Sequence, residues 1–318
     1  MRIGIDVGGT HTDAVIMDGD SLLASTKAMT SADVISGIND ALDKVLADAG
    51  VAQQDIQATM IGTTQFTNAV VERRELSPVA AIRVGLPSGK GLPPMTDWPH
   101  DIHRATQSVT YELAGGYLYD GALLAAMDEA AIDGVIADMR NRDIKNVAIS
   151  SVFSPMNDTP ETHIADKLHR AIPDMRITLS SSFGRLGLLE RENAAILNAA
   201  LLPFAERVVT SFLQALKQRG LTCPVFISQN DGTLMNAEFV RQFPALTFAS
   251  GPTNSLRGAS KLTGLSDAIV VDIGGTTSDI GILQGGFPRQ SNSVIEVGGV
   301  RTNFRMPDIL ALGLGGGE

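Results

Sequence analysis

Two short stretches of the chain carry the residue types that bind phosphate together with a divalent cation. The first is DVGGTHTD, from Asp6 to Asp13, and the second is DIGGTTSD, from Asp272 to Asp279. Consecutive glycines let the backbone approach a ligand closely and present N–H donors, and threonine hydroxyls add further donors for phosphate oxygens. A carboxylate beside phosphates is repelled unless a cation lies between them. The pattern therefore predicts that both stretches bind nucleotide phosphates, with Mg²⁺ or its water molecules at Asp6 and Asp272.

The repetition of this pattern favours a binding site over an ordinary hairpin turn. A single glycine pair between two strands is typical of an ordinary hairpin turn. Here residues 4–17 and 270–283 match, and Asp272 lies 266 positions after Asp6. A separation of this length does not fit a solenoid, whose repeats are about 20 to 50 residues long. The duplication therefore predicts two similar domains that present the same turn and face one another.

The class of phosphate-binding turn can be narrowed further. Neither stretch contains the GxxxxGK[ST] pattern of a P-loop, and neither contains a lysine, so one large class of ATPases is excluded. Charge neutralisation is then left to the cation and the backbone amides. The closing aspartates, Asp13 and Asp279, have two possible roles: they contribute to the site, or they cap the backbone of their own turns.

Composition and charge limit the classes of partner. The chain has 318 residues, 44% of them hydrophobic, which is enough to bury a large core and suggests about two domains. Its formal net charge is -10, and no run of Lys and Arg is longer than Arg73-Arg74, so nucleic acid and anionic lipid find no basic surface. The single cysteine, Cys223, cannot form an internal disulfide. We therefore expect a cytoplasmic protein with neither a nucleic-acid nor a membrane partner, and no stretch long enough to span a bilayer.

The elements that position the two stretches follow from hydrophobic spacing. Short β-branched runs predict strands at residues 2–6 and 14–17, and apolar residues at helical spacing predict a helix over residues 33–47. A buried strand is expected at residues 146–153. Asp158 and Pro160 are typical of the start of a helix, which is expected to run to about Ile172.

Two regions depart from this alternation. Residues 87–119 are rich in Gly, Pro and isolated aromatic residues, and they predict a loop-rich insertion. Residues 187–220 predict two successive helices divided near Pro203, because proline breaks the backbone hydrogen-bond ladder. We expect an N-terminal domain over residues 1–180 and a second domain over residues 181–318. The Gly-rich stretch GLGGGE at residues 313–318 leaves two alternatives: the second domain is truncated, or another polypeptide completes it.

Five segments together resemble the hydantoinase/oxoprolinase family, specifically its ATP-binding A subunit. They are GIDVGGTHTDAVIMDG at residues 4–19, IGTTQFTNAVVERRE at 61–75, ERENAAILNAALLP at 190–203, SGPTNSLRGA at 250–259 and VVDIGGTTSDIGI at 270–282. The paired turns are also similar to those of the actin, sugar kinase and heat-shock ATPase superfamily. This resemblance implies an α/β fold with duplicated ribonuclease-H-like domains and an ATP cleft between them.

The resemblance also implies an activity and its partners. Members of the family use ATP to hydrolyse cyclic amides such as hydantoin and oxoproline, and relatives carboxylate ketones. Phosphorylation of the ring carbonyl oxygen would create a good leaving group and an electrophilic carbon. The implied cofactors are ATP and Mg²⁺, and the implied partners are a small cyclic amide substrate and a B-type subunit in an oligomer. Two other functions stay open: a small-molecule kinase, and a non-enzymatic protein gated by a nucleotide.

The same resemblance assigns roles to particular residues. The implied catalytic residues are Asp6, Asp13, Asp272 and Asp279, with Asp6 and Asp272 as ligands of the metal. The residues implied to bind the nucleotide come from both turns and from the GTTQFTN and SGPTNS segments. They are Gly8, Gly9, Thr10, Thr12, Thr63, Thr64, Asn68, Gly251, Gly274, Gly275, Thr276 and Thr277. For the GTTQFTN segment a second possibility is that its hydroxyls only cap the helix that follows.

Overall fold

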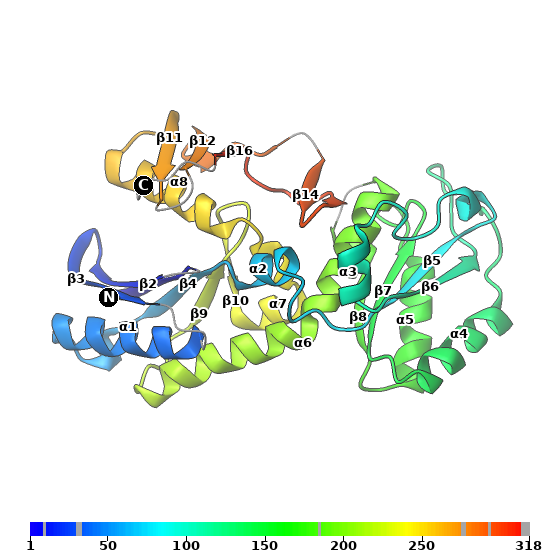
Figure 1. Ribbon diagram of the computed structural model, residues 1–318, viewed down its shortest axis with the longest axis horizontal. Coiled ribbons are helices and arrows are strands. Elements are labelled where there is room, and N and C mark those ends of the chain that lie inside the picture. Colours follow the sequence, from blue (N-terminus) through cyan, green and yellow to red (C-terminus); the bar gives the residue numbers. More distant parts are fainter. Residues whose placement is uncertain (9–10, 30–33, 184–185, 275–277, 292–293, 313–318) are drawn as a thin grey trace. The chain divides into compact units, whose positions relative to one another are not determined.

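The computed structural model describes residues 1–8, 11–29, 34–183, 186–274, 278–291 and 294–312. It confirms the α/β fold and divides the chain into two compact units (Figure 1). The first unit is formed by the described residues of Met1–Thr67, Ala205–Ser293 and Arg305–Glu318, and the second by those of Asn68–Phe204 and Val294–Phe304. Both units are discontinuous in sequence, so this division differs from the predicted domains at residues 1–180 and 181–318.

The first unit contains a mixed six-stranded sheet in the order β10-β9-β4-β1-β2-β3. Strand β1 pairs antiparallel with β2 and parallel with β4. Alternation along β1 gives the sheet two different faces, because Ile3, Ile5 and Val7 are buried on the side covered by helix α1 (Val34–Ala49) whereas Gly4 and Asp6 lie on the other side. The strands of this sheet are β1 (Arg2–Val7), β2 (His11–Asp18), β3 (Ser21–Met29), β4 (Ala58–Thr63), β9 (Val225–Ser228) and β10 (Leu234–Asn236).

A second sheet of the first unit contains the repeated stretch. It comprises β11 (Ala268–Ile273), β12 (Ser278–Gln284), β13 (Phe287–Pro288) and β16 (Ile309–Leu312), and helix α8 (Ser250–Thr263) contacts it. The two copies have the same register: Asp6 is opposite Asp13 in the first hairpin, and Asp272 is opposite Asp279 in the second. The sequence duplication is thus a duplication of a β-hairpin. The remaining helices that begin or lie in this unit are α2 (Gln65–Val71) and α7 (Ala237–Gln242).

The second unit is built on a four-stranded parallel sheet in the order β6-β5-β7-β8. Helices α4 (Glu129–Asn141) and α5 (Thr159–Ala171) cover one face of this sheet and form with it a continuous apolar core (Figure 1). Its strands are β5 (Ala80–Leu86), β6 (Val109–Ala114), β7 (Asn146–Ser151) and β8 (Arg176–Leu179). The unit also contains α3 (His100–Ala105) and a two-stranded sheet of β14 (Ile295–Val297) and β15 (Val300–Thr302).

One local prediction was wrong, and two others gain detail. Residues 87–119 contain α3 and the edge strand β6 besides their loops. Helix α5 begins directly after Asp158 and ends just before Ile172, as predicted, although Asp158 makes no side-chain capping bond and the Thr159 amide donates to Asn157 Oδ1 at 3.1 Å. Residues 188–218 form one helix, α6 (Leu188–Gln218), with Pro203 inside it. A proline in a helix costs about 3 kcal/mol, and the burial of nearly every side chain before Pro203 outweighs that cost.

Helix α6 is also the one described helix whose length and apolar character would suffice to cross a membrane. Its most apolar window has a mean hydropathy of 1.4, and 61% of that window is buried inside the protein. The expectation that no stretch has such a length was therefore wrong for α6. Because most of this window is buried inside the protein, its apolar side chains are accounted for by packing in the core.

The ERENAAILNAALLP segment at the start of α6 packs its charged residues into the second unit. Glu192 pairs with Arg83 of β5, with Arg83 Nε 2.7 Å from Glu192 Oε2, and both side chains are only 2% exposed. Ser150 of β7 donates to the same Glu192 oxygen at 2.6 Å. The next residue, Asn193, accepts from Trp98 Nε1 at 2.8 Å. Buried hydrogen bonds of this segment therefore hold the start of α6 to β5, β7 and Trp98 in the second unit.

We expect Glu192→Gln to destabilise the second unit by about 3–5 kcal/mol, because it leaves the buried Arg83 guanidinium without a charged partner. Urea unfolding followed by circular dichroism measures the loss. The matched control is Glu72→Gln, which removes an ion pair between exposed side chains, Glu72 and Arg74 at 3.5 Å, and should cost less than about 1 kcal/mol. Equal losses in the two variants would contradict a structural role for the buried pair.

Candidate nucleotide site

A cavity of about 410 Å³ opens on the face of the first sheet that α1 does not cover. Its size is in the range of pockets that bind small molecules, which is roughly 300–1,000 Å³. Five strands of the sheet (β1, β2, β4, β9 and β10), the β9–β10 connection and helix α8 supply its walls. The lining residues are Gly4, Ile5, Asp6, Asp13, Val15, Met60, Gly62, Ser228, Gly232, Leu234, Asn254 and Arg257.

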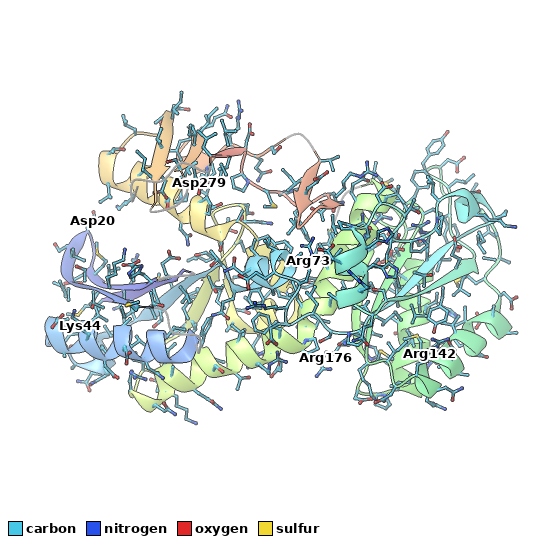
Figure 2. All side chains as sticks on the ribbon, in the orientation of Figure 1. Asp20, Lys44, Arg73, Arg142, Arg176 and Asp279 are labelled. Carbon is cyan, nitrogen blue, oxygen red and sulfur yellow. The ribbon has the colours of Figure 1, made fainter. Side chains whose placement is uncertain are left out.

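The carboxylates of the two hairpins form an acidic group at this site. Asp6 and Asp13 are cross-strand partners on one hairpin, and Asp272 and Asp279 are cross-strand partners on the other, where Asp279 is labelled in Figure 2. Desolvation raises the pKa of Asp6, and the negative charges of Asp13 and Asp272 raise it further. Desolvation and the charge of Asp272 likewise raise the pKa of Asp279. The hairpins therefore hold like charges near one another, an arrangement that a bound cation would stabilise.

The chemistry of these side chains fits Mg²⁺ in its usual protein environment. Mg²⁺ prefers oxygen ligands, keeps several of its waters, and typically takes one or two carboxylates together with substrate phosphates. Within the described part of the chain, no three Asp, Glu, His or Cys side chains converge as ligands of one ion. A hydrated ion held by Asp6 and Asp272 beside phosphates fits this observation, whereas a cage made of protein ligands alone does not. The assignment of these two ligands stays a prediction.

Gly62 at the end of β4 makes room for the Asp6 carboxylate. A Cβ atom at this position would lie 2.5 Å from Asp6 Oδ1 and 2.6 Å from Asn254 Nδ2, closer than van der Waals contact allows. The missing side chain therefore lets a strand of the first sheet, the carboxylate of β1 and the amide of α8 meet at one point. Gly62 was not among the predicted site residues. Its position directly before Thr63, at the end of a predicted apolar run, could have indicated a close approach of another side chain.

Strands β1 and β2 are paired at the ends that flank the first glycine turn. The Gly8 amide donates to the His11 carbonyl at 3.0 Å, as an ordinary hairpin would require. Thr12 is completely buried and lies on the opposite face of β2 from Asp13, so its side chain does not line the cavity. Gly274 is the last described residue before the second turn. Five predicted phosphate ligands lie outside the described residues: Gly9, Thr10, Gly275, Thr276 and Thr277.

The structure brings together the predicted residues of the GTTQFTN and SGPTNS segments. Thr63 Oγ1 accepts from the Gln65 amide at 3.2 Å, so this hydroxyl caps the start of α2. The Thr63 carbonyl accepts from Ser250 Oγ at 3.2 Å, and a Cβ on Gly251 would lie 3.5 Å from Thr64 Cγ2. The first turn of α8 thus packs on the β4–α2 connection, next to the end of β1. Asn68 lies farther along α2, and its role stays a prediction.

Arg257 is a cation in the cavity wall that the sequence analysis did not select. Its guanidinium lies 3.9 Å from the centroid of the Phe287 ring, and Nη1 donates to the Gly286 carbonyl. These contacts hold a positive charge of α8 against the β12–β13 hairpin. The available signal was its spacing, because Arg257 follows Asn254 by three residues and so shares a face of the helix.

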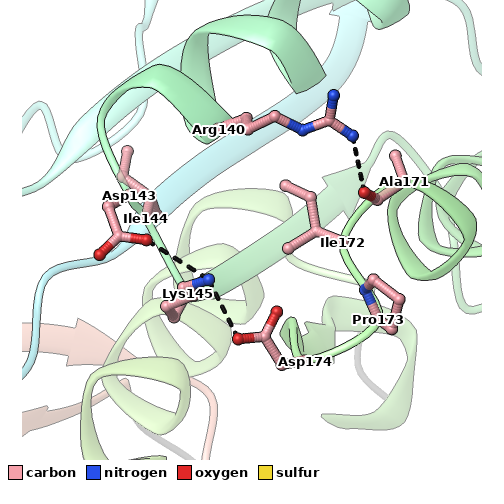
Figure 3. Close-up of a pocket in the computed structure, with 8 residues that line it drawn as sticks. All are labelled: Arg140, Asp143, Ile144, Lys145, Ala171, Ile172, Pro173 and Asp174. Carbon is pink, nitrogen blue, oxygen red and sulfur yellow. Dashed lines mark hydrogen bonds and ion pairs between the residues drawn. The ribbon is translucent and has the colours of Figure 1, made fainter.

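A second hollow, in the second unit, has no comparable unsatisfied charge. It has a volume of about 220 Å³ and lies between the ends of α4 and α5. Lys145 pairs with Asp143 at 3.3 Å and with Asp174 at 3.0 Å, and Arg140 donates to the Ala171 carbonyl at 2.7 Å (Figure 3). The charged groups of this hollow satisfy one another, so its structure supports a role in packing.

Comparison with known families identifies the chain. The model of the hydantoinase/oxoprolinase N-terminal region matches residues 2–172, and the hydantoinase/oxoprolinase model matches residues 191–318. The chain belongs to the hydantoinase/oxoprolinase family. The resemblance inferred from the sequence is therefore confirmed, and the two matches meet near the start of α6.

Two subunits of other enzymes are similar in sequence to this chain. Caprolactamase subunit alpha of Pseudomonas jessenii is 27% identical over 100% of this chain and 48% of its own length. The acetone carboxylase beta subunit of Xanthobacter autotrophicus is 22% identical over 89% of this chain and 43% of its own length. The chain thus spans about half the length of these relatives.

Solved structures show the same fold. The crystal structure of ATP-dependent caprolactamase from Pseudomonas jessenii superimposes with a TM-score of 0.80 at 23% identity, over 98% of this chain and 48% of that one. Nucleotide-free acetone carboxylase superimposes with a TM-score of 0.78 at 20% identity, over 99% of this chain and 48% of that one.

We expect Asp6→Asn to raise the melting temperature of the ligand-free protein at pH 7. The folded pKa of Asp6 is raised, so the folded state binds its proton more tightly, and this stabilisation is lost as the pH rises through the folded pKa. The gain in melting temperature from the neutral amide should therefore shrink as the pH falls toward the ordinary carboxyl pKa of 3.8. Thermal unfolding of both proteins at pH 7 and near pH 3.8 measures this gain. Asp18→Asn, at the exposed end of the same hairpin, controls for net charge, and an equal gain there would contradict the prediction.

Proposed function

We propose that this chain binds ATP with Mg²⁺ and uses the nucleotide to open a cyclic amide, as one subunit of a larger enzyme. The observation that supports the proposal is the pair of matching hairpins: the charges of Asp13 and Asp272 help to raise the pKa of Asp6, and the charge of Asp272 helps to raise the pKa of Asp279. Such a site is complementary to a metal-bound phosphate chain. Membership of the hydantoinase/oxoprolinase family and similarity to an ATP-dependent caprolactamase support the same activity.

The proposed chemistry addresses the low reactivity of an amide. The ring carbonyl oxygen attacks the terminal phosphorus of ATP, the bond from that phosphorus to the ADP oxygen breaks, and the ring nitrogen loses its proton. Water then adds to the activated ring carbon, and the carbon–nitrogen bond breaks as the nitrogen takes up a proton. A second water hydrolyses the resulting acyl phosphate. The products are an open-chain amino acid, ADP and inorganic phosphate, so two waters are consumed.

The residues of this chain have two proposed roles in the reaction: they position the phosphate chain, and they hold the cation that neutralises its charge. The backbone amides of the two glycine turns would bind phosphate oxygens, and Asp6 and Asp272 would hold the hydrated cation. When bound, Mg²⁺ supplies positive charge to the phosphate oxygens during transfer. Asp13 and Asp279, opposite these residues in each hairpin, would accept hydrogen bonds from water molecules at the site. Positioning of the phosphate chain accounts for most of the rate gain in such reactions.

A partner subunit is part of the proposal. The relatives are described as the alpha subunit of a caprolactamase and the beta subunit of an acetone carboxylase, and this chain spans about half their length. We therefore infer that the complete activity requires a B-type subunit, with a small lactam or hydantoin as substrate.

The test measures phosphate release from ATP and Mg²⁺ with hydantoins, lactams and ketones, with and without a candidate B-type subunit. We expect a cyclic amide to stimulate release with the partner present, and we expect Asp6→Ala and Asp272→Ala each to reduce the stimulated rate at least about 100-fold. Mass spectrometry of the products separates the alternatives. A stable phosphorylated product without phosphate release would indicate a kinase, and no stimulation by any cyclic amide would contradict the proposed function.

We expect Gly62→Ala to weaken binding of Mg²⁺-ATP at least about tenfold. The added methyl would occupy the space of Asp6 Oδ1 and Asn254 Nδ2, and both side-chain ends can turn away, so the fold should lose no more than about 1–3 kcal/mol. Isothermal titration calorimetry measures affinity, and thermal unfolding measures stability.

The matched control is Gly258→Ala on α8, where a Cβ would meet no atom within 4 Å. This variant should keep the affinity of the unmodified chain. Unchanged affinity in Gly62→Ala would contradict the assignment of the cavity as the nucleotide site.

A further inference from the structure

A lysine lies next to the first hairpin, although neither glycine stretch contains one. Asp13 of β2 is the register partner of Asp6 on β1 and of Lys27 on β3. Residues opposite one another on neighbouring strands share a face of the sheet. The adjacent Thr26 is buried on the other face, which α1 covers. Asp6, Asp13 and Lys27 therefore form one row across three strands, on the face that bears the cavity.

The ammonium of Lys27 is held only weakly. Its Nζ lies 4.0 Å from Asp13 Oδ1, and the two side chains are 62% and 49% exposed. An ion pair between exposed groups at this distance contributes little to stability, because water screens both charges. Asp13 is the one ionic partner of Lys27 within the part of the chain that the structure describes. The lysine side chain is therefore free to turn toward a stronger anion.

The position of Lys27 brings its charge close to the predicted phosphate-binding turn. Lys27 is opposite Asp13, which lies two residues after His11, where β2 begins directly beyond the turn. At about 3.3 Å per residue, this separation is about 7 Å along the strand. A lysine is a compact charge on a flexible four-carbon stem, and such a group commonly binds phosphate in proteins. Lys27 therefore has the location and the charge to contact the end of a phosphate chain bound at this turn.

Arg257, the cation in the cavity wall, is held by contacts within the protein. Its Nη1 donates to the Gly286 carbonyl, and its guanidinium lies 3.9 Å from the centroid of the Phe287 ring. These contacts direct the side chain toward the β12–β13 hairpin. Lys27 has no comparable anchor, since its ionic contact is with an exposed carboxylate. Of these two cations, Lys27 is the better suited to move with a phosphate during a reaction.

The second hairpin has no lysine at the equivalent position. Asp279 is the register partner of Asp272 on β11 and of Ala311 on β16. The two copies thus match in both aspartates and differ on the third strand, where the first copy has Lys27 and the second has Ala311. A cation that served only to offset the repulsion between paired aspartates would be expected in both copies. Its presence in one copy indicates a role on one side of the site.

We propose that Lys27 is a further catalytic residue, whose ammonium binds the terminal phosphate of ATP and stabilises the negative charge on that group during transfer. This inference rests on the proposed function. Lys27 keeps its proton and forms no covalent bond. It donates a hydrogen bond to a non-bridging phosphate oxygen while the bond from the terminal phosphorus to the ADP oxygen breaks and the bond to the ring carbonyl oxygen forms. After inorganic phosphate leaves, Lys27 pairs with Asp13 again.

The experiment compares the binding of a non-hydrolysable ATP analogue with that of ADP, both with Mg²⁺, by isothermal titration calorimetry on the full 318-residue chain. The analogue carries the terminal phosphate and ADP does not. We therefore expect Lys27→Met to lower the affinity for the analogue at least about tenfold and to change the affinity for ADP less than about twofold. The urea midpoint of this variant should stay that of the unmodified chain, because the ion pair that it removes is exposed.

The matched control is Lys44→Met, which removes the same charge from the exposed side of α1, on the covered face of the sheet (Figure 2). This variant should keep both affinities. Equal losses for the analogue and ADP in Lys27→Met, or no loss for either, would overturn the role of Lys27 and leave the proposed function standing. If the unmodified chain binds neither nucleotide, the nucleotide site is wrong, and the proposed function is overturned together with this inference.

Discussion

Mutual repulsion among the hairpin aspartates is the constraint on which the first unit depends. Each hairpin register sets two carboxylates opposite one another, and partial desolvation together with the negative charges of Asp13 and Asp272 raises the pKa of Asp6. A fold selected for stability alone would not place these groups together. The surrounding elements maintain the arrangement: α1 buries the opposite side of β1, and Gly62 leaves room for the carboxylate. The cost is offset when a cation and phosphates occupy the site.

The charges of the second unit follow a different principle. Arg83 and Glu192 are both only 2% exposed, but they pair with each other, and Glu192 also accepts from Ser150. Lys145 in the hollow between α4 and α5 is likewise paired with two aspartates. Charges that pair within the protein need no ligand, whereas like charges held near one another are stabilised by a bound cation. Asp13 of the acidic site has one exposed ion pair, with Lys27 Nζ 4.0 Å from its Oδ1, whereas Arg83 and Glu192 are paired in the core.

Much of the local structure could be predicted because its signals lie within a few residues. The hairpin strands, α1 and β7 followed from hydrophobic spacing, and the duplicated turn identified the family. Predictions failed where distant packing overrides local preference. Pro203 lies inside a single helix because the segment before it is buried on all sides. Thr12 looked like a phosphate ligand, but strand alternation directs its side chain into the core.

The sequence by itself determined the family, the α/β class and the pair of aspartate-glycine hairpins, because these depend on residue types at short, fixed spacing. Only the tertiary structure decided which face of each hairpin bears chemistry. It placed α1 against Ile3, Ile5 and Val7, set Gly62 under the Asp6 carboxylate, and brought Arg257 to the cavity wall. It also set Lys27 of β3 beside Asp13. Burial and proximity arise from contacts between segments far apart in the chain, and no local pattern specifies which segments will meet.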